Sequence, residues 1–199
     1  HRMQESKVYA ALAYARANNL NYLVYDSPRP RLGIIACGKA YLDVRQALDD
    51  LGIDARVAAD IGLRLYKVAM PWPLDAEGVR RFAEGLEEIL VVEEKRQLIE
   101  YQIKEQLYAW REDVRPRVIG KFADSDEWMP APGAPEPPAT PGATAPGSPA
   151  ARAVGAHGHW LLPPTGELTP AIVARAIAAR VSRLHDSATI RERLAFLDA

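Results

Sequence analysis

The sequence of 199 residues has one cysteine, no long apolar run and no block of like charge. A single thiol cannot form an internal disulfide or a cysteine-based metal site, and it favours a reducing compartment, so we expect a cytoplasmic protein. No stretch approaches the roughly 18 apolar residues of a membrane-spanning helix, and the polar start has no signal-peptide pattern. The 25 basic and 26 acidic residues are interspersed, which argues against nucleic acid or an anionic membrane as a partner.

Common catalytic and nucleotide-binding motifs are also missing. The sequence contains no G-x-G-x-x-G, no G-x-x-x-x-G-K-[ST] and no G-x-S-x-G string. His157 and His159 are spaced like a metal-binding pair, but no third ligand lies nearby in the sequence, and we interpret them as solvated linker residues. Cys37 is interpreted as a packing residue rather than a nucleophile. We therefore assign no catalytic residue and no metal site.

Short apolar runs alternate with amphipathic stretches along much of the chain. The runs are rich in β-branched residues and predict buried strands, and apolar residues spaced by three and four predict helices. The predicted strands are 22–25, 32–37, 63–68, 89–92 and 117–120. The predicted helices are 3–18, 40–51, one capped by Asp75 and running to about residue 86, one carrying Ile99, Ile103 and Leu107, one from 170 to 184, and 187–197. Repeated strand–helix units predict an α/β fold, a Rossmann-like three-layer domain with a mainly parallel sheet.

Composition divides the chain into three segments. Residues 1–129 are predicted to form the α/β domain with an N-terminal helix. Residues 130–149 hold eight of the 16 prolines, mixed with Ala, Gly, Thr and Ser, so 130–159 is predicted to be a flexible linker. Residues 160–199 are predicted to be a C-terminal helical segment, in which Thr169 caps a helix that has Pro170 at its first position.

Open α/β sheets bind ligands at the carboxyl ends of their strands. The residues that the sequence places there, as candidates for a site or an interface, are Gly38, Lys39, Trp72, Glu93, Glu94, and the pair at 120–121. Lys39 stands at a helix start and can meet an anion there, although we favour a solvated lysine after a strand-ending glycine. Glu93 and Glu94 can supply acid or base chemistry, but we favour a helix-capping role for Glu94 and an interface role for Glu93.

Five strings together carry a resemblance to a known family. They are LGIIACGKAYLDVRQAL at 32–48, KVAMPWPL at 67–74, ILVVEEKR at 89–96, PRVIGKF at 116–122 and GELTPA at 166–171. In this order they resemble indolepyruvate ferredoxin oxidoreductase, a 2-oxoacid:ferredoxin oxidoreductase, in the transketolase C-terminal-like domain of its long fused form. The resemblance implies an enzyme that oxidatively decarboxylates arylpyruvates to acyl-CoA. It also implies thiamine diphosphate with Mg²⁺, coenzyme A as co-substrate, iron–sulfur clusters in some members, and ferredoxin as electron acceptor.

The cofactor motifs of that family do not map onto this chain. It lacks the G-D-G…N motif for thiamine diphosphate and the cysteine sets that ligate clusters. We therefore expect a segment that binds no cofactor itself. Our interpretation is an internal, noncatalytic domain that packs against other domains of the same parent chain, in a homodimeric enzyme. The alternative is a free-standing α/β interaction or anion-binding module.

Overall fold

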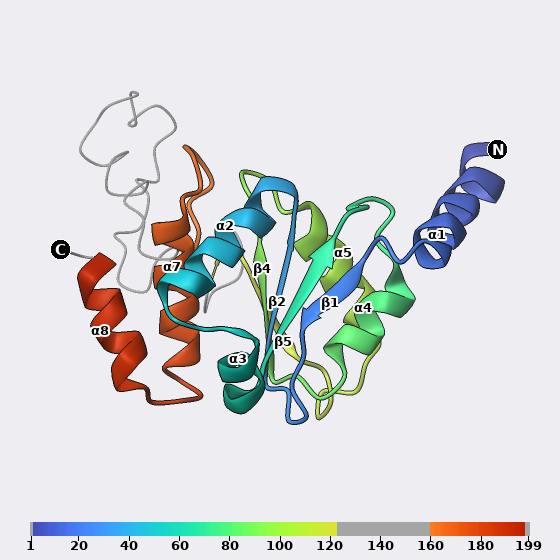
Figure 1. Ribbon diagram of the computed structural model, residues 1–199. Helices are drawn as coiled ribbons and strands as arrows, with labels where there is room; N and C mark the ends of the chain where they lie inside the picture. Colours follow the sequence, from blue (N-terminus) through green and yellow to red (C-terminus); the bar gives the residue numbers. More distant parts are fainter. Residues whose placement is uncertain (1, 123–159, 198–199) are drawn as a thin grey trace, which may run out of the picture.

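The computed structural model describes residues 2–122 and 160–197, and it shows a sheet with helices on both faces (Figure 1). The strands are β1 (Tyr22–Tyr25), β2 (Leu32–Cys37), β3 (Leu63–Val68), β4 (Glu88–Val92) and β5 (Arg117–Ile119). The helices are η1 (Met3–Lys7), α1 (Val8–Ala17), α2 (Gly38–Asp50), α3 (Ala55–Ile61), α4 (Ala76–Ala83), α5 (Leu98–Leu107), α7 (Pro170–Val181) and α8 (Ala188–Leu197). The predicted linker 130–159, with His157 and His159, lies outside the described residues.

The five strands form one sheet in the order β1-β3-β2-β4-β5. β1 pairs antiparallel with β3, and the other three pairings are parallel. Ile34 on the central strand β2 stands opposite Leu65 of β3 and Leu90 of β4, and all three are fully buried. The predicted α/β fold with a mainly parallel sheet is therefore confirmed.

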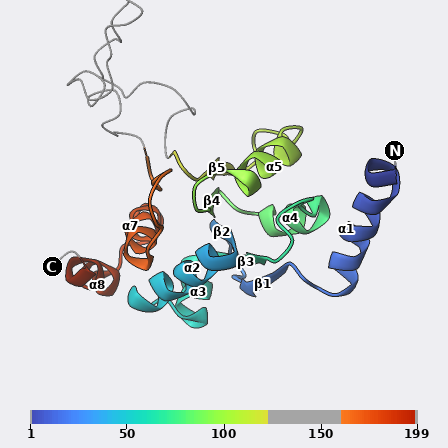
Figure 2. The ribbon, with the colours of Figure 1, turned by 90° about the horizontal axis from the view of Figure 1, so that it is seen from above.

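The sheet separates two hydrophobic layers (Figure 2). Helices α2, α3, α7 and α8 cover one face, and α4 and α5 cover the other. Residues 34 and 35 of β2 belong to opposite layers, as the alternation of side chains along a strand requires. This arrangement explains why the strands read as continuous apolar runs: both of their faces are covered.

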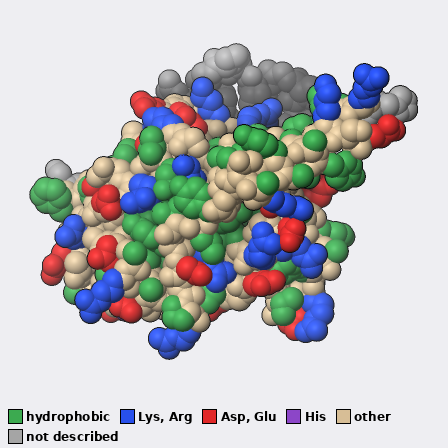
Figure 3. Space-filling view, turned by 45° about the vertical axis from the view of Figure 1, so that its right-hand side comes forward, with side chains coloured by type: hydrophobic (Ala, Val, Ile, Leu, Met, Phe, Trp, Pro, Cys, Tyr) green, Lys and Arg blue, Asp and Glu red, His purple; other side chains and the backbone are tan. Residues whose placement is uncertain are grey.

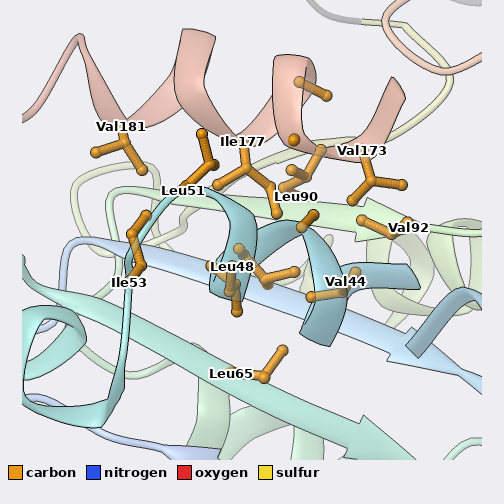
Figure 4. Packing of buried hydrophobic residues seen from close by; sticks show 14 of the residues in the cluster. Val44, Leu48, Leu51, Ile53, Leu65, Leu90, Val92, Val173, Ile177 and Val181 are labelled. Carbon is orange, nitrogen blue, oxygen red and sulfur yellow. The ribbon is translucent and has the colours of Figure 1, made fainter. Parts of the chain in front are cut away.

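Helix α7 belongs to the main core although it follows the predicted linker. Its residues Val173, Ile177 and Val181 are buried, and Figure 4 shows their side chains directed toward α2 and the sheet. Beside this contact, the Arg180 guanidinium pairs with the Glu88 carboxylate at the start of β4. The C-terminal helical segment therefore completes the layer formed by α2 and α3.

Limited proteolysis should cut first within residues 130–159, because proline-rich polar segments rarely fold into structure that protects the backbone from a protease. We expect the two fragments to stay associated, since α7 shares its buried core with α2 and β4. Size-exclusion chromatography of the cut protein should show both fragments in one native peak and two peaks in denaturant. Separation of the fragments in native buffer would contradict this packing.

Two predicted helix caps are confirmed. The Asp75 carboxylate accepts a hydrogen bond from the Gly78 N–H at 3.1 Å, and the Thr169 hydroxyl accepts one from the Ile172 N–H at 3.4 Å. Because the side-chain oxygen satisfies an N–H that has no partner within the helix, each cap defines where its helix begins.

Two local features differ from the expectation. Helix α2 begins at Gly38 itself, with φ +53° at that residue, so no separate turn precedes it. Helix α3 was not predicted from the sequence. It is seven residues long, with the Asp54 carboxylate accepting from the Val57 N–H at 2.8 Å and Gly62 ending it at φ +84°. Because such a short helix shows little hydrophobic periodicity, its capping residue and its final glycine were the only signs of it in the sequence.

Across the described ranges, none of the helices combines the length and the apolar character that crossing a membrane requires.

Candidate functional site

The carboxyl ends of β2 and β4 form the switch point of the sheet. The chain leaves β2 toward β3 on one side, and it leaves β4 toward β5 on the other. Doubly wound sheets bind ligands in the crevice that opens between two such strands. In this chain, Gly38 and Lys39 lie on one side of the crevice and residues 93–95 lie on the other. The predicted candidate residues therefore flank the crevice, with the exception of Trp72.

Residues 160–168, here called the strap, cross this edge of the sheet. Lys39 Nζ donates to the Leu168 carbonyl at 2.7 Å, and Lys121 Nζ donates to the Pro163 carbonyl at 2.9 Å. The Leu161 N–H donates to the Lys121 carbonyl at 2.8 Å. The position where related architectures hold a ligand is thus spanned by the protein's own backbone.

Lys39 contacts three acceptors of its own chain. Besides the strap carbonyl, its ammonium meets Asp43 Oδ2 at 2.9 Å and Glu167 Oε1 at 3.4 Å. The hydrogen bond to Asp43, with the nearby negative charges, raises the pKa of Lys39 above its ordinary value. Three acceptors match the three donors of an ammonium group. Lys39 thus combines these internal bonds with partial exposure, since 46% of its side chain is accessible to solvent.

Glu93 is the capping residue of α5, which corrects the assignment of that role to Glu94. The Glu93 side chain is buried, and Oε1 accepts from the N–H groups of Leu98 and Ile99 at 3.2 and 2.8 Å. Oε2 accepts from the Glu100 N–H at 3.0 Å. Glu94 is half-buried and makes none of these bonds. The physical reason is the turn at residues 94–97, which brings the first turn of α5 back over the end of β4.

Burial raises the pKa of Glu93 above its ordinary value, and the negative charge of Glu100 adds to this effect. The hydrogen bonds from the N–H groups of Ile99 and Glu100 oppose the rise, because they stabilise the ionised carboxylate. A carboxyl group with three internal donors is suited to hold a helix in place.

Lys121 is a central residue of this edge whose role the sequence did not reveal. It is 1% exposed, and its Nζ donates to the Glu93 carbonyl as well as to the strap. Burial lowers the pKa of Lys121, against the attraction of the Glu93 and Glu100 carboxylates. Lysine is rarely buried. Apart from its location after a predicted strand, nothing in the sequence indicated that Lys121 would lie in the interior.

Gly120 allows the close approach on which this cluster depends. A Cβ at this position would lie 2.2 Å from Glu100 Oε2 and 3.2 Å from the Val91 carbonyl oxygen. The Glu100 carboxylate also pairs with Lys104 at 2.7 Å, so it cannot move away freely. Glycine is therefore the residue that fits between β4 and α5 here.

Trp72 lies apart from the other candidates. It follows β3 and is 53% exposed, in a loop that α5 holds through Gln102. The Gln102 amide donates to the Pro71 carbonyl at 2.8 Å and accepts from the Leu74 N–H at 2.9 Å. The loop is thus fixed to the body of the domain, while its tryptophan faces solvent.

The arrangement offers little reactive chemistry. Cys37 is half-buried and packs against the layer of α4 and α5, and burial together with the charge of Glu93 raises the pKa of its thiol. Within residues 2–122 and 160–197, no group of three or more His, Cys, Asp or Glu side chains is placed to hold a metal ion. The buried charges bind backbone groups, and their geometry is that of a structural network.

Comparison with known proteins gives relatives of one kind. The chain is 32% identical over 105 residues to the indolepyruvate oxidoreductase subunit IorA of Pyrococcus abyssi, covering 52% of this chain and 15% of that protein. It is 29% identical over 181 residues to the IorA subunit of Methanothermobacter marburgensis, covering 76% of this chain and 28% of that protein. The chain thus spans less than a third of the length of these relatives.

Two solved structures overlap with parts of the chain. One is the 2-oxoglutarate:ferredoxin oxidoreductase from Magnetococcus marinus, with a TM-score of 0.37, 17% identity, and coverage of 58% of this chain and 20% of that one. The other is a split-gene transketolase, with a TM-score of 0.43, 16% identity, and coverage of 83% and 43%. Residues 21–199 match the family described as the indolepyruvate ferredoxin oxidoreductase middle domain. The chain belongs to this middle-domain family.

Proposed function

We propose that this chain is a noncatalytic structural domain of an indolepyruvate ferredoxin oxidoreductase. The parent enzyme would oxidatively decarboxylate arylpyruvates to acyl-CoA and pass the electrons to ferredoxin. The family match and the names of the relatives support the enzyme class. The observation that carries the noncatalytic role is the strap, because it spans the switch point where a doubly wound sheet otherwise binds a ligand.

The charged side chains at this edge support the same proposal. Lys39, Glu93 and Lys121 are each engaged with backbone groups of their own chain, and reaching a substrate would require breaking those hydrogen bonds. Thiamine diphosphate with Mg²⁺, coenzyme A and any iron–sulfur clusters would then be bound by other domains of the parent protein. The described part of this chain would supply a rigid support for those domains.

Helix α1 is the surface that we propose other domains of the parent chain cover. Residues 8–15 include no charged side chain, and Tyr9 and Tyr14 are 67% and 64% exposed. Figure 3 shows hydrophobic side chains along this projecting helix, and only Ala15 of α1 is buried within the chain. A helix that is apolar around much of its surface is normally buried. Its end is fixed to the domain by the ion pair of Arg16 with Asp75 at 2.6 Å.

The position of α1 relative to the matched domain favours the parent chain as its partner. The family match begins at residue 21, directly after this helix, and the relatives are several times longer than this chain. Trp72 offers a further exposed aromatic side chain for such an interface. We also propose that the parent enzyme is a homodimer and that ferredoxin is its electron acceptor.

Isothermal titration of the 199-residue chain with thiamine diphosphate and Mg²⁺ tests the noncatalytic role. Inorganic pyrophosphate with Mg²⁺ is titrated in parallel, and we expect thiamine diphosphate to bind no more tightly than this simple anion, because the sequence lacks the diphosphate-binding motif. The complete parent polypeptide, titrated under the same conditions, is the positive control and should bind. Binding of thiamine diphosphate by the shorter chain more tightly than inorganic pyrophosphate would show that it contains a cofactor site and would refute the proposal.

A further inference from the structure

A hollow of about 550 Å³ opens between the loop after β4 and the strap. Lys95, Arg96 and Gln97 line it from the loop, and Trp160, Thr165 and Gly166 line it from the strap. This volume falls within the range of about 300–1,000 Å³ that is typical of small-molecule sites. The lining contains two cations and no carboxylate, so the hollow is suited to an anion.

The two cations are carried by a loop that is fixed at both ends. Lys95 has φ +60°, a left-handed conformation that is uncommon for a residue with a side chain. The Glu93 carboxylate binds the start of α5, and the Glu93 carbonyl accepts from Lys121, so the surrounding structure holds the loop in this conformation. A loop that is already ordered loses less conformational freedom when a ligand binds.

Neither cation has an acidic partner in the part of the chain that the structure describes. The nearby acid of the strap, Glu167, pairs with Lys39 at 3.4 Å on the side of α2. Lys95 and Arg96 are exposed and make no ion pair with a described residue. Their positive charges are therefore available to an external anion.

Trp160 supplies a fixed wall of the hollow. Its ring packs against the ring of Phe122, with the two centroids 4.4 Å apart. The Leu161 N–H, next in the chain, donates to the Lys121 carbonyl, which holds this end of the strap on the sheet. The wall and the cationic loop are thus both fastened to the same buried network.

We propose that this hollow binds the phosphate or pyrophosphate group of a small molecule. Arg96 and Lys95 would neutralise the anion, and the planar guanidinium of Arg96 suits bidentate contact with phosphate oxygens. The Thr165 hydroxyl is a further donor at the rim. This site is distinct from the helix start at Lys39, whose ammonium is occupied, and it does not depend on the reaction of the parent enzyme.

The test uses the 199-residue chain and inorganic pyrophosphate at constant, low ionic strength. Calorimetry should show saturable binding, and a Lys95→Gln/Arg96→Gln variant should bind at least about tenfold more weakly. The matched control is Arg29→Gln/Arg56→Gln, which removes the same charge near the opposite end of the sheet and should leave binding unchanged. Pyrophosphate should also change the tryptophan fluorescence of the wild type.

A Trp160→Phe variant locates the site. It should bind pyrophosphate in the calorimeter with nearly the wild-type affinity, but without the fluorescence change. The proposal is overturned if the wild type does not bind, if the Lys95→Gln/Arg96→Gln variant and the control lose affinity equally, or if the fluorescence change persists without Trp160.

Discussion

Replacing Arg180 by methionine is expected to destabilise the protein by about 3–5 kcal/mol, the usual cost of removing one partner of a buried ion pair. Arg180 Nε donates to Glu88 Oε1 at 2.6 Å, and Nη2 pairs with the second carboxylate oxygen. The side chains of Arg180 and Glu88 are only 6% and 14% exposed. Without the guanidinium, the Glu88 carboxylate stays in the interior with no opposite charge.

Urea unfolding of the single variants and of the double variant Glu88→Leu/Arg180→Met measures this effect. The double variant should recover most of the lost stability, because an apolar pair leaves no uncompensated charge between α7 and β4. A cost below about 1 kcal/mol for Arg180→Met, the range of exposed ion pairs, would show that this contact is solvated and that α7 is held by apolar packing alone.

Replacing Glu93 by alanine is expected to cost at least about 2 kcal/mol, because buried N–H groups lose their acceptor at about 1–3 kcal/mol each. The affected groups are those of Leu98, Ile99 and Glu100. Glu94→Ala is the matched control: it removes the same charge one residue away, and it should change stability by no more than about 0.5 kcal/mol. Equal effects of the two substitutions would contradict the assignment of the cap to Glu93.

The effect of Glu93 should also depend on pH. Its folded-state pKa is raised, so the folded protein binds this proton more tightly than the unfolded chain does. The contribution of Glu93 to stability is therefore fully present below its unfolded pKa and decreases as pH rises through the folded pKa. The difference in unfolding free energy between wild type and Glu93→Ala should be widest at acidic pH and narrow above the ordinary value of 4.5.

Much of the fold could be predicted because it depends on local pattern. Ile99, Ile103 and Leu107 recur at helical spacing, and all three are buried on α5. The run at 32–37 is apolar because β2 is covered on both faces. The order of the strands could not be predicted in this way, since it depends on contacts between residues far apart in the sequence.

The candidate site was only partly predictable for the same reason. Strand ends placed Lys39 and Glu93 at the correct edge of the sheet. The strap could not be foreseen, because the contact of Lys39 with Leu168 joins residues 129 positions apart. Glu93 was not identified as the cap because it lies five residues before the helix begins, rather than at the position where capping side chains usually stand.

Turnover of the complete parent enzyme carrying Lys39→Met tests the central claim most directly. Lys39 lies at the switch point and is partly exposed, with 46% of its side chain accessible to solvent. Its replacement should therefore lower stability by no more than about 1 kcal/mol. If the strap makes this edge structural, kcat and KM with indolepyruvate should stay within about twofold of the wild type. A loss of about 10²–10⁴-fold in kcat with an unchanged melting temperature is the signature of acid–base catalysis. That result would place this edge in the active site and contradict the account.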